Sequence, residues 1–268
     1  MTSMGAFDGD SVAVKLEFGS GPREEVGVAP NLNANENARI VRAARSQSGL
    51  HLSLSADGEF HPSAAFGGWQ GAAKRLFDVT IASAALVFLA PLMLLVALAI
   101  RIESKGPVLF GQEREGKGKV PFRALKFRSM QVTQCDTSGV RQTTRDDPRV
   151  TRVGRFIRRT SIDELPQLIN IIKGDMSLVG PRPHVPGMLA AGREYRELVD
   201  YYDLRLLVRP GLTGWAQANG LRGPTTNAAL ARARIDHDLA YVQNFSFWLD
   251  LRIILLTIRR EFFSGSGH

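Results

Sequence analysis

The hydrophobic pattern is dominated by one uninterrupted apolar run at residues 79–100, whose 22 positions carry no charged side chain. As a helix rising about 1.5 Å per residue, the run reaches roughly 33 Å, enough to cross a bilayer core of about 30 Å. Pro91 divides it, and Lys74 and Arg101 make both flanks basic. Because Lys and Arg favour the cytoplasmic side, the pattern predicts a re-entrant helix that breaks at Pro91 and returns to the side from which it entered. A kinked transmembrane helix is the alternative.

The stretch before this run, residues 1–68, is rich in Gly, Ser, Asn and Ala and shows no sustained helical or strand period. Such a composition predicts a disordered N-terminal tail. The stretch does not open with the basic and then apolar segments of a secretory signal. We therefore expect a tail at 1–68, a membrane-inserted re-entrant helix at 69–105 and a cytosolic body at 106–268.

The segment after residue 105 shows shorter patterns. Alternating apolar and polar residues at 108–112 and 122–130 predict a small β-hairpin. Helical patterns follow at about 188–200, 228–242 and 245–258, and the last combines many apolar residues with two charges, which fits a helix lying in the membrane interface. The predicted fold is mainly α with a small β-hairpin, in a monotopic membrane protein with a proline-broken re-entrant helix and interfacial amphipathic helices.

Two adjacent acids, Asp163 and Glu164, precede an amphipathic helix that Gly174 ends. Its apolar stripe follows helical spacing, with Leu165, Leu168, Ile169 and Ile172 at i, i+3, i+4 and i+7. Taking Asp163 as the N-cap keeps Pro166 within the first turn. A carboxylate there is favoured in its ionised form, which suits a nucleophile or a metal ligand. An ordinary helix cap is the alternative interpretation.

Charge is distributed unevenly along the chain. The total is +8, and residues 1–70 carry five Lys/Arg against eight Asp/Glu, a net of −3 that leaves +11 for residues 71–268. A basic body of this kind favours an anionic partner, which could be nucleic acid, anionic lipid or a phosphorylated substrate. Cys135 is the only cysteine, which excludes a disulfide framework. No two histidines have metal-ligand spacing.

Two basic segments are candidates for binding an anion, one before the acid pair and one after it. The arginines at 152–159 come just before it, and they fit either a solvated helix surface or an anion site that Asp163 faces. The glycine-rich loop at 209–223 lets backbone N–H groups approach a phosphate, with Arg209 and Arg222 as candidate charge partners. This loop matches neither a P-loop nor a dinucleotide fingerprint.

Taken together, these motifs resemble the bacterial sugar transferases, also called polyprenyl-phosphate glycosylphosphotransferases, which are monotopic phosphoglycosyl transferases. The resemblance runs from about residue 74 to residue 263. It is carried by KRLFD (74–78), the proline-broken apolar helix, LKFRSM (125–130), DPRVTRVGRFIRRTSIDELPQL (147–168), GDMSLVGPRP (174–183), RPGLTGWAQANG (209–220) and SFWLDLRIILLT (246–257).

The resemblance implies transfer of a sugar-1-phosphate from a UDP-sugar to undecaprenyl phosphate, with release of UMP, at the cytoplasmic face of the bacterial inner membrane. By motif position, Asp163 is the nucleophile that forms an aspartyl phosphosugar, and Glu164 is the ligand of the Mg²⁺ cofactor. Lys126, Arg158 and Arg182 are implied to hold phosphate. Gln217 and Asp250 are implied to lie near the pocket, and Asp238 is a further motif acid.

One departure concerns the glycine loop. Many small members have Arg directly after its Asn-Gly, whereas here Leu221 occupies that position and Arg222 follows. This spacing resembles the branch that uses UDP-glucose in exopolysaccharide initiation, so glucose is favoured over galactose.

The implied partners are the UDP-sugar, undecaprenyl phosphate and inner-membrane lipids, with a homodimer left open. A non-catalytic adaptor of a polysaccharide export machine is the alternative function. Nucleic acid is not expected as a partner, since the chain carries no nucleic-acid-binding motif.

Overall fold

The computed structural model describes residues 14–15, 50, 59–131, 147–223 and 225–264. The predicted tail therefore falls mostly outside the described residues. Its described end belongs to the body, because Phe60 is fully buried in the main hydrophobic core and Phe66 stacks on Phe245 at 4.1 Å. Strand β2 (Glu59–Phe60) pairs with β1 (Val14–Lys15) in an antiparallel register.

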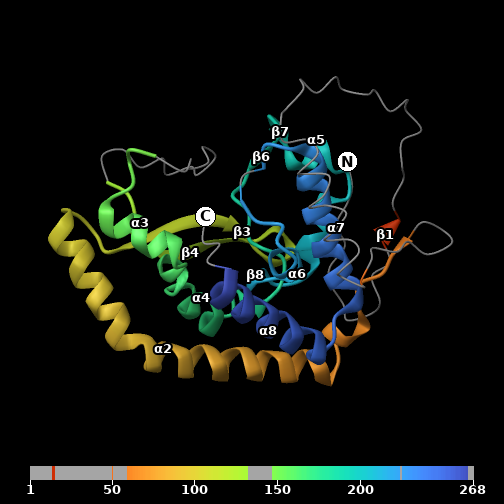
Figure 1. Ribbon diagram of the computed structural model, residues 1–268. Helices are drawn as coiled ribbons and strands as arrows, with labels where there is room; N and C mark the ends of the chain where they lie inside the picture. The colour runs from red at the N-terminus through yellow and green to blue at the C-terminus, as the bar shows by residue number, and fades with distance from the viewer. Residues whose placement is uncertain (1–13, 16–49, 51–58, 132–146, 224, 265–268) are drawn as a thin grey trace.

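The apolar run lies in α2 (Trp69–Glu103), a single helix of 35 residues with Pro91 inside it. The sequence predicted that the helix is interrupted at Pro91, and this is wrong. The helix continues through Pro91 and changes direction by bending (Figure 1). A proline removes one backbone donor and pushes on the preceding turn, which bends a helix without ending it. Among the described helices, α2 alone is long and apolar enough to cross a membrane, and only 11% of its most apolar window is buried.

The rest of the chain packs above the first half of α2, where α4 (Gln167–Lys173) and α8 (Phe247–Ser264) lie along it (Figure 1). On α8, Trp248 and Leu255 are mostly exposed, while Leu249 and Ile253 are in the core. The expected helix near 245–258 is thus confirmed as a helix with one exposed apolar side. The helix expected at 228–242 is confirmed as α7 (Ala228–Asn244).

The predicted hairpin is confirmed. Strands β3 (Leu109–Glu115) and β4 (Pro121–Phe127) pair antiparallel, and Asn170 fastens the second strand to α4. The amide of Asn170 accepts a bond from Leu125 N at 2.9 Å and donates to the Arg123 carbonyl at 2.8 Å. Because the edge of β4 is bound to α4 in this way, the side chains of the strand are fixed relative to the turn before α4.

A second small sheet precedes the Pro181-Arg182-Pro183 segment, here called the PRP turn. In this sheet β5 (Ser177–Val179) runs parallel to β8 (Gly211–Thr213). Gly180 follows β5, and a Cβ there would lie 2.5 Å from the Arg209 carbonyl oxygen, so only glycine permits this approach. The 3₁₀ helix η5 (Tyr202–Leu207) and the short helix α6 (Trp215–Ala218) flank β8.

The helix predicted at 188–200 is wrong. The structure has a two-residue hairpin there, β6 (Leu189–Ala190) and β7 (Arg193–Glu194), followed by the single turn α5 (Tyr195–Leu198). Ala191 and Gly192 both have positive φ, at 51° and 81°. Left-handed backbone at two consecutive residues ends any right-handed helix and closes a tight hairpin.

Candidate active site

The acid pair lies on a tight turn between two helices. Helix α3 (Arg152–Arg159) ends at Thr160, Ser161 takes left-handed backbone with φ 56°, and a 3₁₀ turn, η4 (Ile162–Glu164), follows. Helix α4 begins only at Gln167, with Pro166 at its N-cap. The prediction of Asp163 as the N-cap is therefore wrong, because the left-handed residue and the proline place the pair on a separate turn ahead of the helix.

Glu164 is held by two cations. Its Oε1 is 2.6 Å from Lys126 Nζ and 2.6 Å from Arg182 Nη2, and its Oε2 accepts a bond from Arg182 Nη1 at 3.2 Å. Burial would raise the pKa of Glu164, but Arg182 and Lys126 outweigh burial and hold that pKa well below its usual range. Glu164 is therefore a fixed anion.

Asp163 has the opposite environment. Its side chain is buried, and no donor in the described part of the chain is hydrogen-bonded to its carboxylate. Burial raises the pKa of Asp163; Lys126 opposes this shift, the charge of Glu164 adds to it, and Arg158 is a further lowering influence. Sequence reasoning expected a helix cap to favour ionisation. The finding is instead a carboxylate whose charge depends on neighbouring cations.

Arg182 is fixed from behind by a buried ion pair. Arg205, from η5, donates through Nη2 to the Arg182 carbonyl, and the same guanidinium pairs with Asp238 at 2.8 Å. Both side chains of that pair are almost fully buried. Asp238, expected as a motif acid, thus lies one step behind the site and acts on it through Arg205, a residue that the sequence reading did not single out.

Four guanidinium groups from separate elements gather around His184. Burial and the charges of Arg205, Arg234, Arg114 and Arg182 hold the pKa of His184 well below its usual value. Its Nδ1 is 3.0 Å from the Tyr202 hydroxyl. His184 is therefore a neutral internal residue, and the charge of the cluster is carried by the arginines around it.

Two of these arginines have no acidic partner within the described part of the chain. Arg114 donates to the Pro183 carbonyl at 3.2 Å and to the Gln112 amide oxygen, and burial together with Arg182 lowers its pKa to about 10. Arg234 donates to the Gly223 carbonyl at 3.2 Å. The region behind the PRP turn therefore has more buried positive than negative charge, which sequence spacing gave no signal to find.

Gln217 and Arg222 lie in the glycine-rich segment. Gln217 is buried in α6, and its Oε1 has no hydrogen-bond partner among the described atoms, as expected where a donor is supplied from outside the chain. Arg222 is half-buried, and burial together with the charge of Arg222 lowers the pKa of Arg260 in α8. The structure thus places Arg222 beside a second cation.

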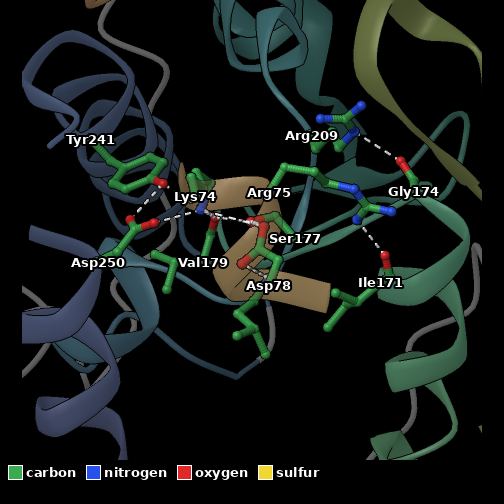
Figure 2. A network of polar contacts seen from close by, with 11 residues as sticks. Lys74, Arg75, Asp78, Ile171, Gly174, Ser177, Val179, Arg209, Tyr241 and Asp250 are labelled. Atoms are coloured by element: carbon green, nitrogen blue, oxygen red, sulfur yellow. Dashed lines mark hydrogen bonds and ion pairs between the residues drawn. The ribbon is translucent and has the colours of Figure 1, made fainter. Parts of the chain in front are cut away.

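Asp250 belongs to a different network (Figure 2). Its Oδ2 is 2.5 Å from Lys74 Nζ, and its Oδ1 accepts a bond from the Tyr241 hydroxyl at 2.8 Å. Lys74 also donates to the Val179 carbonyl at 3.0 Å. One helical turn on, Asp78 accepts from the Ser177 hydroxyl at 2.7 Å. These contacts bind α2 and α8 to β5, so Asp250 holds elements together. Within the described structure, neither Asp163 nor Glu164 is among its hydrogen-bond or ion-pair partners.

The carboxylate pair fits a magnesium ion that is bound partly by the protein and partly by a phosphorylated substrate. Oε2 of Glu164 accepts one bond and keeps a further lone pair, and the neighbouring Asp163 carboxylate is unengaged. No group of three or more His, Cys, Asp or Glu side chains suited to a metal occurs among the described residues. Mg²⁺ typically takes one or two carboxylates plus substrate phosphates, so this donor set fits an ion that binds together with a phosphorylated substrate.

Comparison with known proteins agrees with this geometry. Residues 69–264 match the family model described as bacterial sugar transferase, so the chain belongs to the bacterial sugar transferase family. It is 54% identical to the exopolysaccharide production protein PSS of Rhizobium leguminosarum bv. phaseoli, over 72% of this chain and 97% of that protein.

Larger relatives match over part of their length. The identity is 52% with the undecaprenyl-phosphate glucose phosphotransferase of Komagataeibacter xylinus, over 74% of this chain and 37% of that protein. The identity is 45% with the UDP-glucose:undecaprenyl-phosphate glucose-1-phosphate transferase of Escherichia coli K12, over 73% of this chain and 41% of that protein. The chain therefore spans about two fifths of these two relatives.

Proposed function

We propose that the protein transfers a sugar-1-phosphate from a UDP-sugar to undecaprenyl phosphate through a covalent intermediate on Asp163, as the first membrane step of exopolysaccharide synthesis. The observation that carries this is the difference between the two acids. Glu164 is bound by two cations, whereas Asp163 has no hydrogen-bond partner among the described residues and lies beside it. A nucleophile needs an oxygen that is not already engaged, and Asp163 alone of the pair has one.

The arrangement of charge suits a diphosphate. Lys126, Arg158 and Arg182 all act on the Asp163 carboxylate, and Arg114 and Arg234 add positive charge behind the PRP turn without an acidic partner in the described structure. An anionic nucleophile and a diphosphate repel each other, and fixed cations offset that repulsion during phosphoryl transfer. We assign phosphate binding to Lys126, Arg158 and Arg182. We assign Gln217 and Arg222 to the part of the substrate that lies away from these three cations.

Each half of the reaction exchanges one bond at phosphorus. An Asp163 oxygen bonds to the phosphorus next to the sugar, the bond from that phosphorus to the bridging oxygen breaks, and UMP leaves with the electron pair. A phosphate oxygen of undecaprenyl phosphate then bonds to the same phosphorus, and the Asp163 carboxylate is released. The products are UMP and a polyprenyl diphosphosugar.

We assign Mg²⁺ to Glu164 as the cofactor. When bound, the ion would neutralise charge on the diphosphate. Glu164 itself stays ionised because Arg182 and Lys126 depress its pKa, so it can hold a cation across a wide range of pH. Asp163 remains available to the substrate.

The way in which α2 is attached to the body supports a membrane arrangement. Its N-terminal half is bound through Lys74 to Asp250, and its C-terminal end is bound by Arg128, which donates to the Ser104 carbonyl at 2.7 Å. A straight helix of 35 residues would be about 52 Å long, yet both ends of α2 contact the same body. This supports a re-entrant helix with the catalytic body on one face, which we assign to the cytoplasmic side of the inner membrane.

We propose UDP-glucose as the donor. The Asn219–Arg222 spacing resembles the glucose branch, and the names of several relatives specify glucose, although one relative from Aeromonas hydrophila, at 45% identity, is named for N-acetylgalactosamine. Comparing UDP-glucose, UDP-galactose and UDP-N-acetylgalactosamine with the purified protein would decide this choice.

The test of the covalent step uses UDP-glucose labelled in the sugar. The purified full chain is expected to become labelled, to release one equivalent of UMP, and to lose the label when undecaprenyl phosphate is added. Asp163→Asn should abolish labelling and UMP release. Glu164→Gln, which removes the proposed metal ligand and keeps the proposed nucleophile, should slow labelling without abolishing it. Unchanged labelling of Asp163→Asn would refute the assignment, and complementation by that variant would favour the adaptor alternative.

A further inference from the structure

Helix α3 presents a basic and aromatic face that the proposed reaction does not use. Arg152, Arg155, Phe156 and Arg159 fall at i, i+3, i+4 and i+7, which places them on one side of the helix, here called the outer face of α3. All four are exposed, and the Phe156 side chain is 60% exposed. The helix contains no acid, and no ion pair engages these three arginines within the described structure.

The opposite side of α3 is fixed to the end of α2. Ile157 is fully buried and packs with Val96, Ile100 and Phe127 in a separate apolar cluster. The Glu103 carboxylate, in the last turn of α2, accepts bonds from the backbone N–H groups of Arg152 at 2.7 Å and Val153 at 3.0 Å. Figure 1 shows α3 at the point where the second half of α2 ends. The outer face is therefore held at a set position relative to the apolar helix.

The last turns of α2 also expose apolar side chains, next to the charged Arg101 and Glu103 of the final turn. Leu95, Leu98 and Ile102 are 66%, 57% and 77% exposed. Such a surface is stable in the acyl region of a bilayer, and the segment directly after it then lies at the level of the lipid headgroups. The three arginines and one aromatic ring of α3 have the chemistry of that level, where cations meet anionic headgroups and rings enter the acyl boundary.

We propose that the outer face of α3 binds anionic phospholipid headgroups in the leaflet that α2 enters. Charge complementarity selects this occupant, because the face carries three cations without an ion-pair partner in the described structure, and its one apolar side chain is an aromatic ring suited to the interface. Arg158 lies outside the stripe and acts on Asp163 instead, so α3 divides its arginines between the site and the membrane.

The binding has a consequence for the site. Helix α3 runs through Thr160 directly into the turn that carries Asp163 and Glu164. A lipid-bound α3 fixes that turn at headgroup height, where the phosphate of a polyprenyl phosphate also lies. This consequence rests on the proposed function, whereas the lipid binding itself does not.

The experiment measures lipid preference without any substrate. The full chain is placed in nanodiscs of phosphatidylcholine and phosphatidylglycerol, free of polyprenyl phosphate, and the association of spin-labelled phosphatidylglycerol is compared with that of spin-labelled phosphatidylcholine. We expect a preference for phosphatidylglycerol that weakens as salt is added. Near an anionic surface each arginine contributes about fivefold, the equivalent of about 1 kcal/mol, so Arg155→Gln/Arg159→Gln should lower the preference at least fivefold.

Two further variants keep the result specific to this face. Arg155→Lys/Arg159→Lys keeps the charge and should keep the preference. Arg193→Gln/Arg232→Gln removes the same charge from exposed positions in β7 and α7 and should also keep it. The proposal is overturned by equal association of the two lipids with the wild-type chain, by an unchanged preference in Arg155→Gln/Arg159→Gln, or by an equal loss in the β7/α7 control. Loss of transferase activity alone would move none of these readouts.

Discussion

At the scale of single residues, two neighbouring carboxylates acquire opposite properties from their surroundings. Lys126 and Arg182 bind Glu164 directly and lower its pKa. Burial raises the pKa of Asp163, and the same two cations act on Asp163 by electrostatic attraction without a hydrogen bond. The two acids are adjacent in sequence, but they differ in side-chain length and in the cations that they contact. The roles proposed for them are therefore not interchangeable, since exchanging the residue types would also exchange their lengths and contacts.

Lys126 provides the first prediction. Lys126 lowers the pKa of Asp163 more than any other charged residue does. Lys126→Met should therefore raise that pKa further. The attack proposed for Asp163 requires its ionised form, so the acid limb of the pH profile for UMP release should move to higher pH, with activity at neutral pH reduced roughly 10- to 100-fold.

The matched control for this prediction is Arg123→Gln, which removes an exposed cation from the same strand and should leave the acid limb in place. An acid limb that stays fixed or moves to lower pH in Lys126→Met would contradict the role given to Lys126.

The sequence predicted several of the charged residues of the site but not how they contact one another. Lys126, Arg158, Arg182 and the acid pair were identified from motifs, and the structure brings them together. Their mutual contacts depend on long-range placement, such as the Asn170 bonds that fix β4 against α4. The N-cap prediction was wrong because the left-handed Ser161 is not visible in a helical periodicity pattern.

At the scale of elements, the network in Figure 2 joins α2 to α8 through a buried ion pair. Sequence reasoning treated Lys74 as a basic membrane flank, yet its ammonium is buried against Asp250. A flanking charge and an internal ion pair look identical in a linear sequence, because only the partner 176 residues away distinguishes them.

Lys74→Met should therefore destabilise the protein. It would leave Asp250 buried without its cation, which typically costs about 3–5 kcal/mol. Burial already raises the pKa of Asp250, and Lys74 opposes that shift, so the variant's folded-state pKa should rise further above the unfolded value. Folding stability then falls as pH rises between those two values, and the deficit should be larger at pH 8 than at pH 5.

Thermal unfolding in detergent at the two pH values measures this effect. Lys74→Met/Asp250→Leu removes both charges and should recover part of the loss. A deficit that shrinks with rising pH would contradict the assignment.

The bend in α2 provides the next prediction. In a straight helix, replacing an interior proline by alanine would stabilise the protein by up to about 3 kcal/mol. Here both ends of α2 are bound to one body, through Lys74 at one end and through the Ser104 carbonyl at the other. Pro91→Ala favours a straight helix that cannot satisfy both attachments, so we expect a lower melting temperature and reduced transferase activity. A higher melting temperature with full activity would show that the bend is not required.

At the scale of the whole molecule, the apolar helix and the basic body form one structure. The sequence correctly indicated a mainly helical chain with a hairpin and one long apolar helix. It placed a boundary between the membrane segment and the rest because composition changes there. Ala82 of α2 and Phe60 before it nevertheless lie in the same core as α4, α7 and α8, and composition carries no information about such packing.

This shared core leads to the last prediction, which concerns shortened chains. Residues 106–268 alone would lack Lys74 and Asp78, leaving the Asp250 carboxylate and the Ser177 hydroxyl buried without those partners. They would also lack Phe60, whose side chain is fully buried. We expect this fragment not to fold cooperatively, whereas residues 59–268 should unfold in detergent within a few degrees of the full chain. Circular dichroism melts of both fragments make the comparison. A cooperative melt of residues 106–268 at the full chain's temperature would show that the body does not need α2, and the ion pair at Lys74 would then be an attachment made after folding.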